Sequence, residues 1–340
     1  MLDINSTTLP PTGPLRILVL AGGPSAEREI SLLSGEAVAH SLAQSGHYVT
    51  QFDPCHEQLT GVEASHFDVA FVALHGRYGE DGGVQAQLET LGLPYTGSGP
   101  EASALAFSKT AAKARFIAHG VPTPDAVTFQ VGKSLAECVE RAAPLGFPVV
   151  VKPDRQGSSI GISFAHDREE LAQSISAALV FDTQGLIEVA IAGEEWTVPL
   201  LDELVLPPIR IGTPQAFFDY EAKYQREDTA YEFPSDVSPA RLSRINEIAQ
   251  HAARSLGVTS LSRVDLRIDA SGQPWVLEVN TIPGLTDHSL APKSAAQSGL
   301  TFAQFCEEVC RRAIAAHRVH PSFRQNRHAR GVSLDIRRAS

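Results

Sequence analysis

The side chains best suited to chemistry are gathered in one short stretch of this chain. They are an arginine, two carboxylates and an amide: Arg263, Asp265, Glu278 and Asn280. The runs VDLRID and WVLEVN, on either side of the turn-like SGQP, predict a β-hairpin. If its turn is centred between the Ser and Gly of SGQP, Asp265 lies opposite Glu278. Arg263 then lies opposite Asn280, and all four side chains share one face.

This cluster of oxygen ligands indicates a cation site. Two carboxylates and an amide oxygen on one face repel one another unless a cation lies between them, and hard oxygen ligands suit Mg²⁺. Arg263 adds a planar fork of donors that suits a phosphate or a carboxylate. The same residues are also typical of a solvated strand face with alternating charge. The hairpin alone does not decide between these interpretations, so the elements around it must.

The composition describes a globular protein and argues against some classes of function. With 340 residues, 43% of them hydrophobic and 20% charged, the chain has the length of about two or three domains. Its formal net charge of -11 argues against nucleic acid as the main partner, because surfaces that follow a phosphate backbone are usually basic. An anionic nucleotide would therefore need a locally basic site.

The cysteines and the termini predict a cytoplasmic protein. The four cysteines have no CxxC spacing, which favours idle thiols in a reducing compartment over zinc binding or disulfides. The first residues lack the cationic start and apolar core of a secretory signal, and no apolar run is long enough to cross a membrane. We expect no membrane association, a flexible leader over residues 1–14 and a basic flexible tail over residues 318–340.

Strands alternating with helices predict a doubly wound α/β unit at the start of the chain. The strand-like runs RILVLA, YVTQFD and DVAFVALHG have βα spacing, and Ser25 is predicted to cap the first helix. Ligands bind at the carboxyl ends of such strands, where Glu27 and His75 lie. Glu27 either holds an ammonium group or favours the helix start. His75 is either a donor to an oxyanion or a histidine satisfied by backbone. The absence of GxGxxG argues against a dinucleotide-binding dehydrogenase.

Two lysines follow at positions that suit phosphate binding. The run ALAFSKTAAKARFIAHG predicts one helix that carries Lys109 and ends at Gly120. The run VVVKPDRQGSSIG predicts a strand that ends near Lys152, then a loop whose N–H groups and hydroxyls suit phosphates. It is not a Walker A motif. A solvent-facing lysine and an ordinary hairpin loop are the alternatives.

Two irregular segments come next. The link between the strand-like runs LIEVAI and EEWTVPLL is compatible with an adenine on its backbone edge, with Glu195 near ribose. Residues 217–233 are polar and aromatic without helical or strand periodicity. They form either a lid that brings Lys223 and Tyr224 over a polyanion or an exposed surface loop.

The end of the chain predicts helices around an anion site. A helix is predicted over residues 239–257, before the hairpin, and the last one over residues 301–317. Between the hairpin and this last helix, Gly284 permits close approach of backbone. Ser289 and Leu290 begin a helix whose N-terminus suits an anion.

Taken in order, these signals resemble one family. The motifs GGPSAEREISLLSG, LHGRYGEDGGVQAQLE, PYTGSG, VVVKPDRQGSSIG, YEAKY and LEVNTIPGLTDHSL are similar to those of the D-alanine–D-alanine ligase family in the ATP-grasp superfamily. The resemblance extends over about residues 15–317. It implies an N-terminal α/β domain and two α+β domains that hold ATP between them. The implied boundaries are 15–100, 101–190 and 191–317, with a lid loop at 217–234.

The resemblance also implies roles for individual residues. The residues that match ligands of two Mg²⁺ or Mn²⁺ ions are Asp265, Glu278 and Asn280. Those that match ATP-binding positions are Lys109, Lys152, Ser158, Glu188, Val189, Ile191, Glu195 and Lys223. Those that match substrate-binding positions are Glu27, His75, Ser289 and Leu290. Those that match catalytic positions are Glu27, Ser158, Tyr224, Arg263 and Gly284.

The implied reaction is the ATP-dependent ligation of two D-alanines for peptidoglycan precursors. The carboxylate of the first D-alanine attacks the γ-phosphoryl group of ATP, and the amine of the second attacks the resulting acyl phosphate. The resemblance further implies a homodimer. One alternative is a relative that uses D-lactate or D-serine as second substrate, and Tyr224 favours D-alanine over D-lactate. The other is an ATP-binding regulatory module without chemistry.

Overall fold

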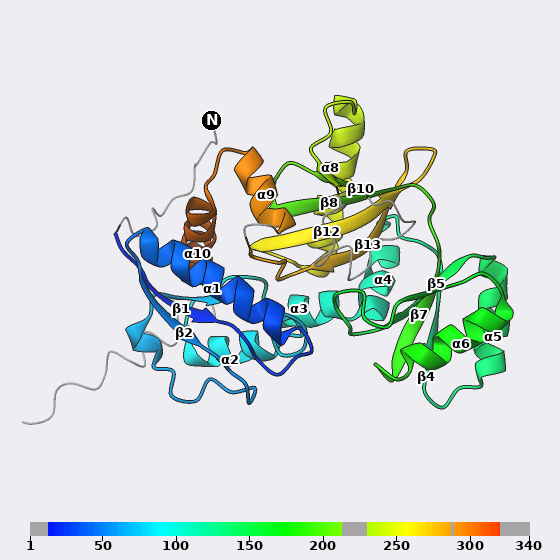
Figure 1. Cartoon of the computed structure of the whole chain (residues 1–340), viewed down its shortest axis with the longest axis horizontal. Coiled ribbons are helices and arrows are strands. Elements are labelled where there is room, and N and C mark those ends of the chain that lie inside the picture. The colour runs from blue at the N-terminus through cyan, green and yellow to red at the C-terminus, as the bar shows by residue number, and fades with distance from the viewer. Residues whose placement is uncertain (1–12, 213–229, 287–288, 320–340) are drawn as a thin grey trace, which may run out of the picture.

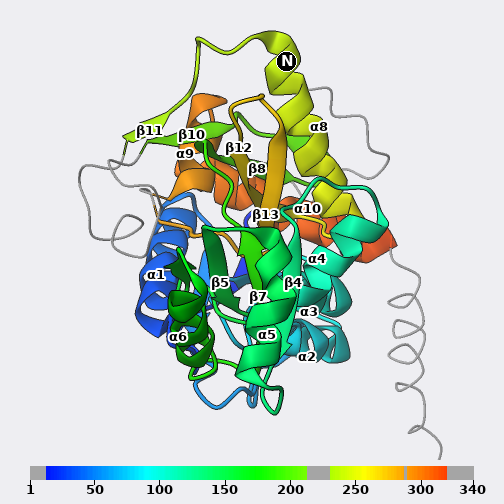
Figure 2. The same ribbon diagram turned by 90° about the vertical axis from the view of Figure 1, so that its right-hand side faces the viewer.

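The computed structural model of the chain describes residues 13–212, 230–286 and 289–319. Within these residues the strands form three separate sheets, which Figures 1 and 2 show from two directions. Most of the predicted leader and tail, and Lys223 and Tyr224 of the predicted lid, lie outside the described residues. In the described part of the chain, no helix has the length and hydropathy needed to cross a bilayer.

The first sheet is parallel, as the βα spacing predicts, with strand order β2-β1-β3. Alternate residues of β1 enter different cores. Ile17 and Val19 pack with α1 and α10, whereas Leu18 and Leu20 pack with α2 on the opposite face. The bounds are β1 (Arg16–Leu20), α1 (Arg28–Gln44), β2 (Tyr48–Phe52), β3 (Val69–Val72) and α2 (Gly83–Leu91), with a 3-10 turn at Ala64–His66.

The second sheet is antiparallel, with order β4-β7-β5-β6, and it has a hydrophobic core of its own under α5 and α6. Its strands β5 and β6 flank the predicted phosphate loop. The bounds are β4 (Ala126–Gln130), α5 (Leu135–Ala142), β5 (Val149–Pro153), β6 (Ser163–Ala165), α6 (Arg168–Ala178) and β7 (Gln184–Val189), with a 3-10 turn at Ala143–Leu145.

The third sheet carries the hairpin of the predicted metal ligands. Its order is β11-β10-β8-β12-β13, with β9 paired to β8, and its strands are antiparallel. The strands are β8 (Glu194–Leu201), β9 (Leu204–Val205), β10 (Ile209–Gly212), β11 (Ala230–Glu232), β12 (Leu261–Ile268) and β13 (Pro274–Asn280). The helices are α8 (Pro239–Leu256), α9 (Leu290–Gln297) and α10 (Phe302–Val319).

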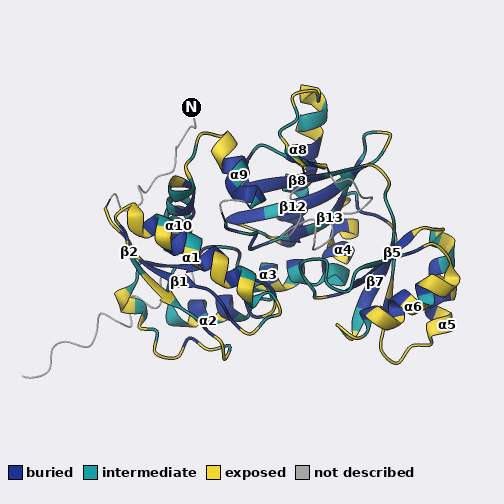
Figure 3. Ribbon diagram, viewed as in Figure 1, coloured by how far each residue is buried: buried dark blue, intermediate teal, exposed yellow. Residues whose placement is uncertain are grey.

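The cores connect segments that are far apart in the chain. The core under β1 and β3 continues through α9 and α10 to Leu201 and Leu261 of the third sheet. Helix α4 contributes Ala112 and Phe116 to the core of that sheet, not to the core of the second. Figure 3 shows the buried residues on the strands and on the inner sides of the helices. The first and third sheets are therefore joined by one core.

The helix predicted to carry Lys109 is in fact two helices, α3 (Pro100–Phe107) and α4 (Lys109–Ala118). The prediction of one helix was wrong because Ser108 is extended and caps α4, accepting from Ala111 N at 3.3 Å. Buried Asp154 stabilises the break. Its carboxylate accepts from Ser108 Oγ at 2.9 Å and from Thr110 N at 2.8 Å. Lys109 consequently begins a helix that is tied to the end of β5.

The hairpin has the predicted pairing at the candidate site. Arg263 pairs with Asn280, and Asp265 pairs with Glu278. The turn itself is centred on Ser271, because Ile268 pairs with Pro274. The predicted centre, between Ser271 and Gly272, was therefore wrong by half a residue. A register shift next to Asp265 adds one residue to β13, and this irregularity restores the predicted pairs.

Candidate active site

Asp265 is the centre of the cluster on the hairpin. Its carboxylate accepts hydrogen bonds from Arg263 Nε at 2.8 Å and from Arg263 Nη2 at 2.7 Å. Asn280 Nδ2 donates to it at 3.0 Å, and Thr197 Oγ1 of β8 donates at 2.6 Å. Asp265 is only 9% exposed. The structure therefore does not show the solvated strand face that was the alternative for this cluster.

The oxygen atoms of this cluster suit a divalent cation. The amide group of Asn280 is oriented by the hydrogen bond that its Nδ2 donates to Asp265. The Oδ1 of Asn280 accepts no hydrogen bond from the described residues. Glu278 adds a second carboxylate from the paired position. Among the described residues, no group of three His, Cys, Asp or Glu side chains suits a metal. The donor set here is two carboxylates and an amide, which matches the preference of Mg²⁺ for oxygen.

Lys109 connects α4 to this cluster. Its Nζ donates to Gln156 O at 2.7 Å and lies 3.6 Å from Glu278 Oε2. The Lys109 side chain is 11% exposed, so the alternative of a solvent-facing lysine is not what the structure shows. One ammonium group thus lies between the loop after β5 and a predicted metal ligand.

Lys152 and Glu188, both predicted to bind ATP, form a buried ion pair between β5 and β7. Lys113 Nζ lies 3.0 Å from the other oxygen of Glu188. Burial acts to raise the pKa of the Glu188 carboxyl, but the two ammonium groups outweigh it and lower that pKa overall. Sequence reasoning assigned no role to Lys113, although its position four residues after Lys109 was a signal, because it indicates the same helix face.

Arg267 holds the predicted adenine link in place. Its Nε donates to Ile191 O at 3.2 Å and its Nη2 donates to Gly193 O at 2.9 Å. Its Nη1 donates at 3.1 Å to Glu195, the residue expected near ribose. Arg267 was not predicted, yet its period-2 spacing from Asp265 was a signal that both lie on one face. At the other end of the link, Val189 N donates to Asp125 O at 3.0 Å.

Glu27 and Ser158 join the first sheet to the second. Ser158 Oγ donates to Glu27 Oε1, as the resemblance implies for these two positions. The contact needs Gly157, because a Cβ there would lie 2.6 Å from Glu27 Oε2. Glu27, not the predicted Ser25, is the residue that precedes α1. Ser25 instead donates its hydroxyl to His75 O at 2.6 Å.

His75 is buried behind this contact. Its Nε2 lies 3.0 Å from Ser34 Oγ of α1. Burial, and to a lesser degree the charge of Arg263, lowers the pKa of His75 to about 4. The imidazole is therefore neutral at pH 7, and it can act as a donor without carrying charge.

Glu80 is a further carboxylate that sequence reasoning missed. It follows the turn after β3, and its Oε2 accepts from Gly76 N at 3.0 Å. Burial raises the pKa of Glu80 well above its usual value, and the charges of Glu27 and Glu278 raise it further. The run GEDGG that contains Glu80 was interpreted first as a turn and only second as functional, because the sequence does not show which distant acids face it.

Ser289 precedes α9, as predicted. Its Oγ accepts from Thr286 N at 3.1 Å. Gly284 lies against it so closely that a Cβ at Gly284 would be 2.8 Å from Ser289 Oγ. Leu290, the first residue of α9, is 8% exposed. The three predicted residues of this segment are thus close together at one helix N-terminus.

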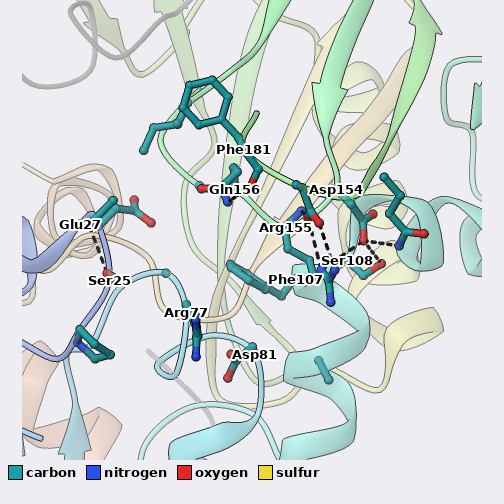
Figure 4. A pocket seen from close by; sticks show the side chains of 18 residues that line it. Ser25, Glu27, Arg77, Asp81, Phe107, Ser108, Asp154, Arg155, Gln156 and Phe181 are labelled. Carbon is teal, nitrogen blue, oxygen red and sulfur yellow. Dashed lines mark hydrogen bonds and ion pairs between the residues drawn. The ribbon is translucent and has the colours of Figure 1, made fainter. Parts of the chain in front are cut away.

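Two cavities of about 770 Å³ each meet at Glu27 and Gly157. The first contains the predicted substrate residues and part of the hairpin cluster. It is lined, among others, by Glu27, His75, Glu80, Ser158, Arg263, Glu278, Asn280, Gly284, Ser289 and Leu290. Lys109, Lys152, Glu188 and Glu195 do not line it. Figure 4 shows the second cavity, where Arg77 and Asp81 lie across from Arg155 and Phe107.

Two family models match this chain. The model described as "D-ala D-ala ligase C-terminus" matches residues 116–311, and the one described as "D-ala D-ala ligase N-terminus" matches residues 51–98. The chain is 45% identical over 298 residues to a D-alanine–D-alanine ligase of Ectopseudomonas mendocina, covering 88% of this chain and 94% of the relative. It is 46% identical over 287 residues to one of Chromohalobacter salexigens, covering 84% and 90%.

Solved structures share the fold. A D-alanine–D-alanine ligase of Bacillus anthracis complexed with ATP has a TM-score of 0.79 at 30% identity, covering 89% of this chain and 99% of that one. The VanG D-Ala:D-Ser ligase of Enterococcus faecalis has a TM-score of 0.76 at 29% identity, covering 87% and 98%.

The fold and the site together define an ATP-grasp protein, which confirms the predicted combination of α/β and α+β units. The family models and the relatives are more specific. The chain belongs to the D-alanine–D-alanine ligase family, and it is an enzyme, an ATP-dependent ligase.

Proposed function

We propose that the chain joins two D-alanines into D-alanyl-D-alanine for peptidoglycan precursors, converting ATP to ADP and phosphate. The observation that carries this proposal is the convergence of two sets of groups on one cavity. Glu278, Asn280 and Arg263 line it from the hairpin, Glu27 lines it from the residue before α1, and Ser158 lines it from the loop between β5 and β6. This is the arrangement that phosphoryl transfer to a small amino acid requires.

The two amino acids are bound by groups of opposite charge. Glu27, fixed by Ser158, attracts the ammonium group of the first D-alanine. His75 lies beside it as a neutral donor. The N-terminus of α9, with Ser289 and Leu290, binds the carboxylate of the second D-alanine, because its N–H groups and dipole favour an anion.

The reaction proceeds in two displacements. An oxygen of the first carboxylate forms a bond to the γ-phosphorus as the bond to ADP breaks, and Lys109 and Lys152 offset the spreading charge. The second amine attacks the acyl phosphate carbon in its neutral form, and the proton that its nitrogen then loses leaves with the phosphate. Arg263 and the Gly284 N–H stabilise the oxyanion until the carbon–oxygen bond to phosphate breaks. The roles of Lys223 and Tyr224 stay predictions.

The hairpin residues Asp265, Glu278 and Asn280 would hold two Mg²⁺ or Mn²⁺ ions. Such ions neutralise phosphate oxygens during the transfer. Support comes from the oxygen donor set and from the amide oxygen of Asn280, which accepts no hydrogen bond within the part of the chain that the structure describes. Val189 and Ile191 would contact adenine through backbone, and Glu195 would contact ribose.

The remaining parts of the proposal concern organisation. We propose domains at residues 15–100, 101–190 and 191–317, a homodimer and a cytoplasmic location. The family resemblance supports the domains and the dimer. The four cysteines are free, which is consistent with a reducing compartment.

The test is phosphate release by the full chain with ATP, Mg²⁺ and one of D-alanine, L-alanine, D-serine or D-lactate. We expect release with D-alanine and formation of the dipeptide. Preference for D-serine or D-lactate as second substrate would contradict the specificity. Absence of release with every compound would contradict the enzyme function.

A further inference from the structure

Lys113 is a buried cation for which the proposed reaction has no use. It lies on α4, is 6% exposed, and shares the carboxylate of Glu188 with Lys152. Burying an ammonium group is costly unless it is paired and hydrogen-bonded. The pair Lys152–Glu188 is already neutral without it. The ion pair alone therefore does not explain why a second lysine is buried against the same carboxylate.

The contacts of Lys113 fix it independently of Lys152. Its Nζ donates to Thr123 Oγ1 at 2.9 Å and to Pro124 O at 2.6 Å, besides its contact with Glu188. An ammonium group has three N–H donors, so these partners use all of them. Lys113 is thus anchored to the segment between α4 and β4.

The same segment is bonded to the strand of the metal-ligand cluster. Thr123 Oγ1 donates to Val276 O at 2.8 Å, and Val276 N donates to Pro122 O at 2.8 Å. Val276 lies on β13, which also carries Glu278. One short network therefore runs from the buried carboxylate in the second sheet, through Lys113 and Thr123, to the third sheet.

This arrangement matters when a nucleotide is bound. If Lys152 turns to phosphate, as the proposed function requires, Glu188 loses one of its two cations. A buried carboxylate without a partner is strongly unfavourable. Lys113 stays in place because Thr123 and Pro124 hold it, and it remains as the partner of Glu188.

We propose that Lys113 is a positioning residue for the nucleotide, which keeps Glu188 paired and oriented when Lys152 binds phosphate, and which aligns the second sheet with β13. This inference rests on the proposed function. Lys113 touches neither substrate, and it acts through Glu188 and Thr123.

The test is a double-mutant cycle with Lys113→Met, Glu188→Gln and the double variant, read out by calorimetric binding of Mg²⁺-ADP without D-alanine. We expect K113M to weaken ADP binding about tenfold and to raise the KM for ATP similarly, with kcat changed less than about threefold. In the E188Q background, the same change should weaken binding less than about twofold. The exposed Lys133→Met is the matched control, and it should bind as the wild type does.

A second pair of variants keeps the test decisive if K113M does not fold. Thr123→Val removes the hydroxyl from the network at nearly constant shape, and Thr123→Ser keeps it. We expect T123V to weaken ADP binding about three- to tenfold and T123S to restore it. Equal binding by T123V and T123S, wild-type binding by folded K113M, or the same loss with and without Glu188 would each overturn the inference. Because ADP binding needs no D-alanine, an inactive wild type would contradict the proposed function alone.

Discussion

At the scale of single residues, Asp265 and Glu278 differ although they face each other. Asp265 is buried and satisfied by Arg263, Asn280 and Thr197, whereas the side chain of Glu278 is 29% exposed beside Lys109. Asp265 therefore contributes to the structure as well as to the proposed metal site. Glu278 contributes mainly charge. A substitution at Glu278 can therefore test metal binding separately from the stability of the fold.

We expect Glu278→Gln to lower kcat at least about 100-fold while leaving the melting temperature within a few degrees of the wild type. The change removes negative charge from the proposed metal site but keeps the shape of the side chain. Phosphate release at saturating Mg²⁺ and a thermal melt measure the two effects. Glu169→Gln, at an exposed site on α6, is the control. Unchanged turnover would show that Glu278 is not a ligand.

His75 predicts a pH dependence of stability. Its pKa is lowered to about 4 in the folded chain, so between about pH 6.5 and 4 the unfolded chain binds more protons. This contribution is absent above pH 6.5 and destabilises the fold increasingly as the pH falls, by about 3 kcal/mol near pH 4.

His75→Gln should remove this part of the pH dependence, because glutamine does not titrate. Urea unfolding at several pH values between 7 and 4 measures the free energy of unfolding of both proteins. We expect the curve of H75Q to be flatter by about 3 kcal/mol over this range. Parallel curves for the two proteins would show that His75 is protonated normally.

At the scale of elements, the break between α3 and α4 positions Lys109. Asp154, at the end of β5, accepts from Ser108 and Thr110 and also from Gln184 Nε2 at 2.9 Å. Asp154→Ala should therefore destabilise the fold by about 3 kcal/mol, because it leaves three partly buried donors without their acceptor. Ser108→Ala, which removes only the cap, should cost about 1 kcal/mol. Chemical unfolding measures both, and equal losses would contradict this account of the break.

The link between β7 and β8 is held in place by the side chain of Arg267. Arg267 bonds two of its carbonyls and Glu195. Arg267→Met should raise the KM for ATP about tenfold with little change in the KM for D-alanine, because only the proposed nucleotide edge loses its support. Steady-state kinetics with each substrate varied in turn distinguishes the two. The exposed Arg244→Met serves as control, and a larger effect on D-alanine would count against this role.

At the scale of the whole molecule, the cores predict unequal stability. The first and third sheets share a core through α9 and α10, whereas the second sheet has its own. The second sheet is joined to the rest by polar contacts such as Glu27–Ser158 and the Lys113–Glu188 pair. Fewer apolar contacts across a junction permit local opening at lower free energy.

Hydrogen exchange should show this difference. We expect the amides of β4, β5 and β7 to exchange faster than those of β1 and β12 in the free protein. Mg²⁺-ADP should slow the first group, because the proposed nucleotide site includes residues of both the second and third sheets. Exchange followed by mass spectrometry measures both groups. Identical rates with and without nucleotide would contradict this placement of the site.

The local sequence pattern was sufficient to predict the elements that carry much of the candidate site. The period-2 alternation of VDLRID and WVLEVN predicted the hairpin and the pairing of Asp265 with Glu278. Helix signals likewise predicted α8 and the start of α9. The prediction failed for the helix around Lys109, because the break there depends on Asp154, 46 residues away from Ser108. The predicted centre of the hairpin turn was also wrong, because the residue types do not reveal the register shift next to Asp265.

The sequence by itself determined most of the element types and the family, and it predicted the residues of the candidate site, because these depend on residue type and local spacing. Only the tertiary structure decided which charges are neighbours. The burial of Lys113 against Glu188, the clamp of Arg267 on the link and the raised pKa of Glu80 each arise between segments distant in the chain. Electrostatic interactions depend on distance and burial, and neither follows from the order of residues along the chain.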